Sequence, residues 1–279
     1  MKKRPYYDTI FLFSLFLILL WGYLNSITNP KHQVFPENLD DDNINIFILA
    51  GQSNMAGRGG VMFQVWDELV PPECSSDHRI LRLNENSELE VAKEPLHAGI
   101  DVNKTCGIGP GMAFASAILR RVPNFGTIVL VPCAAGGTSI RGWSRSNSVL
   151  RSRMIARARE ALRYGGKIRA ILWYQGEKDT ETEEAMNLYP GEYRVFIDSL
   201  YQELMHPQVP FIQVALASGQ GDPKWLESVR TTQLGMEDMI TVDAKGLPLQ
   251  PDGLHLTTMA QVRLGNMLAD AFLNSNTSV

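Results

Sequence analysis

Residues 44–57 decide the fold, and they read Ile44-Asn45-Ile46-Phe47-Ile48-Leu49-Ala50-Gly51-Gln52-Ser53-Asn54-Met55-Ala56-Gly57. The first seven residues are almost all apolar and rich in isoleucine, which is typical of a buried β-strand. The next seven place Ser53 between two glycines, directly after that strand. At a strand-to-helix turn, a serine can present its hydroxyl beside the free N–H groups of the turn. It is either a nucleophile, which needs a base within hydrogen-bond reach, or an ordinary helix N-cap.

Strands and helices alternate from here to the end of the chain. Further apolar runs typical of buried strands cover residues 126–131, 168–174, 210–217 and 239–243. Helical patterns cover residues 109–122, 149–164, 181–205, 224–238 and 257–273, and we expect a break in the third at Pro190-Gly191. Residues 61–106 have no sustained period and read as a long excursion, and the sequence leaves open whether it forms a lid. We therefore expect one α/β domain over residues 44–279, a three-layer αβα sandwich with a five-stranded parallel sheet.

In such folds, ligands bind beyond the carboxyl ends of the strands, and the loop after the fifth strand carries a candidate base. It contains Asp252 and His255, three residues apart. The carboxylate can accept a hydrogen bond from one imidazole nitrogen and leave the other free to take the proton of Ser53. The alternative is a capping aspartate next to a surface histidine. The other four histidines lie in the stem, in the excursion or at a helix end: His32, His78, His97 and His206.

Two more loops at the same edge contain groups that could stabilise a negative oxygen. The loop after the second strand contains Gly136 and Gly137, whose backbone N–H groups can approach a ligand because they carry no side chain. The loop after the third strand contains Gln175, whose amide is a possible oxyanion donor. The alternatives are a tight connection for the glycines and a locally hydrogen-bonded strand end for the glutamine.

Taken together, these loops resemble a known family. The motifs Gly51–Met55, Gly136–Thr138, Gln175–Glu177 and Asp252–His255 occur in the order found in the carbohydrate esterase branch of the SGNH-hydrolase superfamily. That branch is related to sialate O-acetylesterase and to plant acetylxylan esterases. The resemblance covers about Ile44 to Leu273, and it implies a flavodoxin-like sandwich that removes acetyl esters from sugars without a cofactor.

The resemblance also assigns roles to individual residues. Ser53 would be the nucleophile, His255 the base and Asp252 the group that orients it. The oxyanion hole would comprise the N–H of Ser53, an N–H at Gly136 or Gly137, and the side chain of Gln175. The wider superfamily has an asparagine where this chain has Gln175, and the glutamine points to the carbohydrate branch. Whether Glu177 also touches the catalytic histidine is left open.

The leading functional hypothesis is therefore a serine O-acetylesterase that acts on a polysaccharide, with xylan suggested only by the family branch. Candidate sugar contacts are Asn54, Glu177, Arg141 and Trp143, although Trp143 could equally pack in the core and Arg141 could form a surface ion pair. No metal is expected, because the sequence has no His-Glu-x-x-His motif and no Cys/His cluster at ligand spacing. The alternative hypothesis is a non-catalytic glycan-binding protein that keeps the fold.

Composition excludes several other classes of protein. The 279 residues are 44% hydrophobic and 20% charged, which are globular values that rule out a wholly disordered chain. The formal charge of −4 gives no electrostatic basis for nucleic-acid binding. Three cysteines are too few for a disulfide-built scaffold. Cys74 and Cys106 could pair in an oxidising compartment, whereas Cys133 at the end of an apolar run is expected to be a buried thiol.

The first 43 residues predict a secretory route. Residues 1–8 form a basic tail, residues 9–28 a charge-free apolar segment, and residues 29–43 a polar stem. Such a segment is either an uncleaved signal anchor that attaches the protein to a membrane or a cleaved signal peptide. Because the basic residues precede it, the body should face the lumen or the outside, as a Golgi-like type II membrane protein or a secreted one. The sequons at Asn103 and Asn276 are glycosylation candidates in that compartment.

Overall fold

The computed structural model describes residues 43–204 and 209–275. These residues form an α/β fold built on one seven-stranded sheet. The strand order is β5-β4-β6-β1-β7-β8-β9. These strands are β1 (Ile44–Gly51), β4 (Ile80–Leu83), β5 (Leu89–Val91), β6 (Thr127–Pro132), β7 (Lys167–Tyr174), β8 (Phe211–Ala215) and β9 (Ile240–Asp243). A separate antiparallel pair consists of β2 (Val61–Met62) and β3 (Val65–Trp66).

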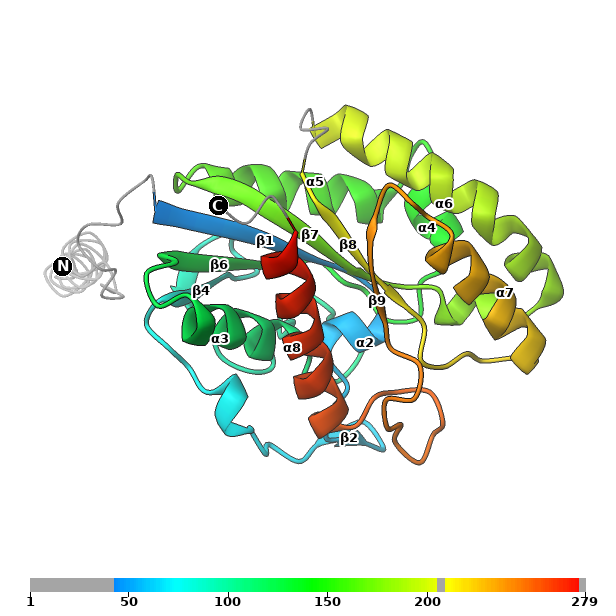
Figure 1. Cartoon of the computed structure of the whole chain (residues 1–279), viewed down its shortest axis with the longest axis horizontal. Helices are drawn as coiled ribbons and strands as arrows, with labels where there is room; N and C mark the ends of the chain where they lie inside the picture. The colour runs from blue at the N-terminus through cyan, green and yellow to red at the C-terminus, as the bar shows by residue number, and fades with distance from the viewer. Residues whose placement is uncertain (1–42, 205–208, 276–279) are drawn as a thin grey trace, which may run out of the picture. The chain divides into compact units, whose positions relative to one another are not determined.

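Helices cover both faces of the sheet (Figure 1). Their bounds are α2 (Ser53–Ala56), α3 (Gly111–Arg121), α4 (Ile140–Ser144), α5 (Val149–Leu162), α6 (Glu183–Leu204), α7 (Pro223–Leu234) and α8 (Thr258–Asn274), with short 3₁₀ turns η2 (Pro72–Cys74) and η3 (Glu177–Thr180). Helices α3 and α8 pack together on one face, and α4 to α7 lie on the other. The three-layer αβα sandwich is thereby confirmed.

Buried aromatic rings fill both interfaces between the sheet and its helices. Phe47 of β1 packs edge-on against Phe114 of α3 and Phe272 of α8, with ring centroids 4.9 and 5.0 Å apart. On the opposite face, Trp173 of β7 stacks on Phe196 of α6 at 4.5 Å. All five side chains are fully buried. Burial on this scale removes apolar surface from water, which is the main force that holds the helices to the sheet.

The five expected strands are present, but the expected strand count was wrong. The sheet has seven strands, because the excursion contributes β4, which pairs parallel to β6, and β5, which pairs antiparallel to β4. Both strands are short, and a charged pair interrupts their apolar pattern: Arg82 lies opposite Glu90, with Nε 2.6 Å from Oε1. Among the five expected strands, the order β6-β1-β7-β8-β9 is the flavodoxin-like 2-1-3-4-5 order.

The expected helix break at Pro190-Gly191 was also wrong. Helix α6 runs without interruption from Glu183 to Leu204, and both Pro190 and Gly191 are exposed. Its buried side is a continuous stripe of large side chains: Tyr189, Tyr193, Phe196, Ile197, Leu200 and Leu204. The packing of that stripe outweighs the lost backbone hydrogen bond and the local cost of a proline inside a helix.

Several expectations from the sequence concern residues that the structure does not describe. The basic tail, the apolar segment 9–28, almost all of the stem and Asn276 lie outside the described residues. Within the described residues, no helix is long and apolar enough to cross a membrane. Asn103 is described, and it is exposed in the loop that precedes α3.

The three cysteines are buried free thiols. Cys74 and Cys106 therefore do not form the disulfide that the sequence left open, whereas the expectation of a buried thiol at Cys133 is confirmed. Burial raises the pKa of Cys106 to about 11 and that of Cys133 to about 11, so neither is ionised near neutral pH. Cys106 lies instead against Arg58, whose Nη1 is 3.6 Å from its sulfur.

Candidate active site

A sharp turn at the end of β1 presents Ser53. Gly51 has a φ of 127°, and a Cβ there would lie 2.1 Å from the carbonyl oxygen of Tyr174, so only glycine fits. The N–H of Gln52 donates to that same carbonyl at 2.8 Å, which fixes the turn against β7. Ser53 is the first residue of α2, where helix geometry leaves its N–H without an intrahelical acceptor.

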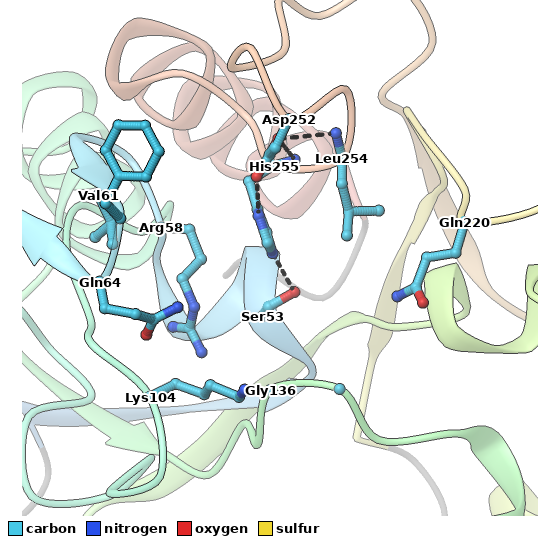
Figure 2. A pocket seen from close by; sticks show the side chains of 12 residues that line it. Ser53, Arg58, Val61, Gln64, Lys104, Gly136, Gln220, Asp252, Leu254 and His255 are labelled. Atoms are coloured by element: carbon cyan, nitrogen blue, oxygen red, sulfur yellow. Dashed lines mark hydrogen bonds and ion pairs between the residues drawn. The ribbon is translucent and has the colours of Figure 1, made fainter.

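The structure brings Ser53, His255 and Asp252 together, although 202 residues separate the serine from the histidine. The Oγ of Ser53 lies 3.0 Å from Nε2 of His255. The Nδ1 of the same imidazole lies 2.6 Å from Oδ2 of Asp252 (Figure 2). Nucleophile, base and orienting carboxylate thus form one continuous chain of hydrogen bonds.

The loop around Asp252 keeps its carboxylate ionised. Oδ1 accepts hydrogen bonds of 2.9 Å from the N–H groups of Leu254 and His255, which leaves Oδ2 for the imidazole. Burial raises the pKa of Asp252, but the two N–H groups and the imidazole outweigh that effect and hold the pKa below its usual value. An ionised carboxylate here can orient the imidazole and stabilise its protonated form.

A cavity of about 250 Å³ opens beside the serine (Figure 2). Its lining comes from six segments of the chain: Ser53 and Arg58; Val61, Phe63 and Gln64; Lys104; Gly136 and Gly137; Gln220; and Asp252, Leu254 and His255. In the close view, Gln64 and Lys104 lie on one side of the serine and Gln220 on the other. A substrate group placed between these two sides would meet the serine hydroxyl.

The two glycines of the loop after β6 differ in what their N–H groups do. The N–H of Gly136 donates to Oδ2 of Asp101 at 3.2 Å, and that oxygen also binds Nη2 of Arg58 at 2.5 Å. Gly137 lines the cavity, and its N–H has no acceptor among residues 43–204 and 209–275. Of the two candidate donors expected here, the structure leaves Gly137 free and commits Gly136 to Asp101.

Gln175 is not placed at the cavity, contrary to the expected oxyanion role. Its side chain is fully buried, and its Nε2 donates to Oδ2 of Asp179 at 2.5 Å and to the carbonyl of Thr138 at 3.0 Å. The Asp179 carboxylate also accepts the N–H of Ile140 at 2.9 Å. Burial raises the pKa of Asp179 to about 6, against the opposing effect of these hydrogen bonds. The amide of Gln175 thus braces the loops that lead into α4 and η3.

Asn54 and Glu177 are also buried, and they do not line the cavity as the expected sugar contacts would. Asn54 Nδ2 donates to Oε1 of Glu177 at 2.8 Å, and its Oδ1 accepts the N–H of Leu256 at 2.9 Å. Burial raises the pKa of Glu177 to about 7. Glu177 therefore contacts Asn54, and the link to the loop of His255 runs through the asparagine.

The other two expected sugar contacts, Trp143 and Arg141, do not line the cavity beside Ser53 either. Trp143 is fully buried against Trp173, with ring centroids 5.1 Å apart, and its Nε1 donates to Oγ1 of Thr138 at 3.1 Å. Arg141 lines a separate cavity, with its Nε 4.0 Å from Oε1 of Glu192. Core packing and a surface ion pair, the alternatives left open by the sequence, describe these residues.

Six cavity residues were not nominated from the sequence: Arg58, Val61, Phe63, Gln64, Lys104 and Gln220. They lie in segments without a sustained sequence period, and only the folded chain brings the last four to the serine. The described residues contain no group of three or more His, Cys, Asp or Glu side chains arranged to hold a metal ion.

Comparison with known proteins assigns the family. The sequence profile described as "Carbohydrate esterase, sialic acid-specific acetylesterase" matches residues 43–274. The chain belongs to this family. It is 48% identical over 239 residues to "Probable carbohydrate esterase At4g34215" of Arabidopsis thaliana, which covers 82% of this chain and 90% of that protein. The resemblance to SGNH-type carbohydrate esterases is thereby confirmed.

Solved structures agree with the assignment to this carbohydrate esterase family. The X-ray structure of the Arabidopsis thaliana protein AT4G34215 superimposes with a TM-score of 0.79, at 48% identity, over 83% of this chain and 98% of that one. The crystal structure of NanS superimposes with a TM-score of 0.65 over 83% of this chain and 97% of that one, at 16% identity. At that identity, NanS is evidence for the shared fold alone.

Proposed function

We propose that this protein is a serine O-acetylesterase that removes acetyl groups from a carbohydrate. One observation carries the proposal: the hydrogen-bonded chain from Ser53 Oγ through His255 to Asp252 opens onto a cavity large enough for an acetylated sugar ring. Membership of a carbohydrate esterase family supports the substrate class. A protein that only bound glycans would have no need for a hydrogen-bonded nucleophile and base.

In the first half-reaction, the Oγ of Ser53 attacks the acetyl carbonyl carbon while Nε2 of His255 takes the hydroxyl proton. The negative charge that develops on the carbonyl oxygen is stabilised by the N–H groups of Ser53 and Gly137. Collapse of this intermediate breaks the bond between the carbonyl carbon and the sugar oxygen. The imidazolium of His255 then returns its proton to that oxygen, and the free sugar hydroxyl leaves.

In the second half-reaction, water attacks the acetyl–serine ester, with His255 again acting as base. Collapse releases acetic acid, which ionises to acetate, and Ser53 recovers its proton from the imidazolium. Asp252 stays ionised throughout and holds the imidazole in the orientation that each transfer requires. No reactant other than the ester and water enters this sequence.

The proposal extends to an acetylated polysaccharide of the xylan type, a substrate suggested by the family branch. It also extends to a location in the secretory pathway, supported by the charge-free residues 9–28 that follow a basic tail. N-terminal sequencing of the protein recovered from the membrane fraction and from the soluble fraction of its native cells separates the alternatives. A start near Met1 in the membrane fraction supports an anchor, a start near Asn29 in soluble material supports a cleaved signal, and a soluble chain that starts near Met1 contradicts both.

Acetate release from acetylated xylan and from an aryl acetate tests the activity, with the full chain and its Ser53→Ala variant side by side. We expect the variant to lose at least about 10³-fold in kcat on both substrates. Ser228→Ala, on the exposed side of α7, is the matched control and should keep the wild-type rate. Equal rates for wild type and Ser53→Ala would contradict the serine mechanism. Glycan binding by a folded protein that releases no acetate would favour the glycan-binding alternative.

A further inference from the structure

One wall of the cavity is made by the excursion, and we call it the hairpin wall. It consists of Val61, Phe63 and Gln64 from the β2–β3 hairpin, together with Lys104 from the loop before α3. The hydroxyl of Thr105 donates a hydrogen bond of 2.7 Å to the carbonyl of Gln64 and ties the two segments together. The wall is thus built from two segments of the excursion that this hydrogen bond holds together.

The tip of the hairpin has a backbone conformation that its residues rarely adopt. Strands β2 and β3 are joined by two residues only, Phe63 and Gln64, whose φ angles are 50° and 63°. Two-residue turns with positive φ at both positions are normally made by Asn-Gly or similar pairs. A phenylalanine in the left-handed region is uncommon because its side chain crowds the backbone. Such strain concentrates at sites where a side chain must be held in one place for binding.

Packing against the rest of the protein does not account for the ring of Phe63. Its side chain is 93% exposed, which leaves almost the whole ring in contact with water. Val65, across the turn in the same hairpin, is also exposed at 68% but does not line the cavity. An aromatic ring that is both held at a cavity mouth and left uncovered offers a free apolar face.

The polar members of the hairpin wall have unused hydrogen-bonding capacity. Lys104 has no ion-pair partner among the described residues, and the side-chain amide of Gln64 has no described partner either. The neighbouring Arg58 differs, because the carboxylate of Asp101 balances its charge. Figure 2 shows Gln64 and Lys104 on the same side of Ser53. The wall therefore combines an apolar face with an amide and an amine that are free to bind a ligand.

We infer that Phe63 is the platform on which the acetylated sugar ring stacks, and that Gln64 and Lys104 bind its hydroxyl groups. The inference rests on the proposed function and deepens it, because it says which residues select the sugar. The C–H face of a pyranose is apolar and fits an aromatic ring, whereas its rim of hydroxyls needs donors and acceptors. Stacking on this wall would hold the ring beside Ser53, with the ester directed at the serine hydroxyl.

The test compares full-length Phe63→Ala, Phe63→Trp and Phe63→Asn with the matched hairpin control Val65→Ala. Acetate release is measured from an acetylated xylo-oligosaccharide and from ethyl acetate, which has no ring to stack. For Phe63→Ala we expect the ratio of kcat/KM on the sugar to kcat/KM on ethyl acetate to fall roughly 3- to 10-fold, mainly through KM. Phe63→Trp should keep the ratio, because tryptophan also presents an aromatic face.

Phe63→Asn separates a binding role from a structural one. Asparagine adopts positive φ more readily than phenylalanine, so this variant should unfold at a melting temperature about 1–3 °C higher, while losing the sugar preference as Phe63→Ala does. A residue kept for stability would show the opposite shift.

Three results would overturn the inference: an unchanged ratio in Phe63→Ala, an equal fall in Val65→Ala, or a lower melting temperature in Phe63→Asn. Its failure is distinguishable from failure of the proposed function. If the wild type released no acetate from any acetylated sugar but cleaved ethyl acetate, both the proposed function and the stacking role of Phe63 would be contradicted. If the wild type and Phe63→Ala released acetate from the acetylated sugar equally well, only the stacking role of Phe63 would be contradicted.

Discussion

The guanidinium of Arg58 lies 2.5 Å from the carboxylate of Asp101, and both side chains are buried beside the cavity. The same carboxylate oxygen accepts the N–H of Gly136, which fixes the glycine loop. The carbonyl of Arg58 accepts Nε2 of Gln250 at 2.5 Å, and the N–H of Gln250 donates to the carbonyl of His255 at 2.7 Å. Through this ion pair and its own backbone carbonyl, Arg58 thus joins the segment that carries the nucleophile to the glycine loop and to the loop that carries the base.

Asp101→Asn should destabilise the protein by about 3 kcal/mol, because it leaves the buried charge of Arg58 without a counter-charge. It should also lower kcat, since the loop that carries Gly137 loses its anchor. Urea unfolding and acetate release measure the two effects. The control is Asp77→Asn, whose carboxylate pairs with Arg79 near the surface. That change should cost less than about 1 kcal/mol, and an equal loss in both variants would contradict a special role for the Arg58–Asp101 pair.

Alanine substitutions at the two loop glycines should have different consequences. A Cβ on Gly136 would lie 2.5 Å from Nη2 of Arg58, so Gly136→Ala must displace the ion pair. A Cβ on Gly137 would meet nothing within 4 Å, and its φ of 73° costs only about 1–2 kcal/mol for alanine. Gly136→Ala should therefore lower both stability and kcat more than Gly137→Ala does. Thermal unfolding and steady-state kinetics of the two variants test this order. A larger effect in Gly137→Ala would contradict the view that the Arg58–Asp101 pair holds the glycine loop in place.

The hydrogen bond between Asn54 and Glu177 supports the loop of His255. We therefore expect its loss to lower activity although Ser53, His255 and Asp252 are unchanged. Asn54→Ala removes the partner of the Glu177 carboxyl and of the Leu256 N–H, next to His255. We expect kcat to fall about 10- to 100-fold, by analogy with other supports of an active-site residue. Glu177→Gln keeps an acceptor for the Asn54 amide and should retain most of the activity. A larger loss of kcat in Glu177→Gln than in Asn54→Ala would contradict this supporting role of the Asn54–Glu177 hydrogen bond.

The sequence predicts the parts of the fold in which a single local pattern dominates. β1 is buried along its whole length and β7 over its last five residues, and such isoleucine- and leucine-rich runs between turn signals favour buried strands. β4 and β5 are missed because each is short and carries one member of the Arg82–Glu90 pair, which only cross-strand pairing makes compatible with burial. The interior position of Pro190 was missed for a related reason, since the stripe that stabilises α6 acts through tertiary packing.

The candidate site divides in the same way. Ser53, Asp252 and His255 each lie in a compact motif whose geometry is set within a few residues, so the sequence alone nominates them. Trp143 was misplaced because a tryptophan that follows a glycine loop has the same sequence context whether it faces a cavity or the core. Phe63 was missed because its turn lacks the Asn-Gly signature of a two-residue hairpin. Distant contacts decide both cases.

Glu94, a buried carboxyl group that takes no part in the catalytic hydrogen bonds, should make the stability of the protein depend on pH. Glu94 lies in the excursion with 9% of its surface exposed, and Oε2 accepts the N–H of Leu96 at 2.9 Å. Burial raises the pKa of Glu94 to about 8, although nearby N–H groups and the charge of Arg82 act in the opposite direction. Glu177 and Asp179 shift in the same sense, also because of burial.

In the unfolded chain, Glu94 ionises near a pKa of about 4.3, so between that pH and about 8 the folded state binds the extra proton. Its contribution to stability is therefore complete below about pH 4 and is lost as the pH rises to about 8. Glu94→Gln mimics the neutral carboxyl at every pH and should reduce the fall in unfolding free energy between pH 5 and pH 8.5 by an amount on the order of 2–4 kcal/mol. Urea midpoints over that range measure the effect, with the exposed Glu68→Gln as the control. Parallel curves for wild type and Glu94→Gln would show that Glu94 is already ionised in the folded protein at neutral pH.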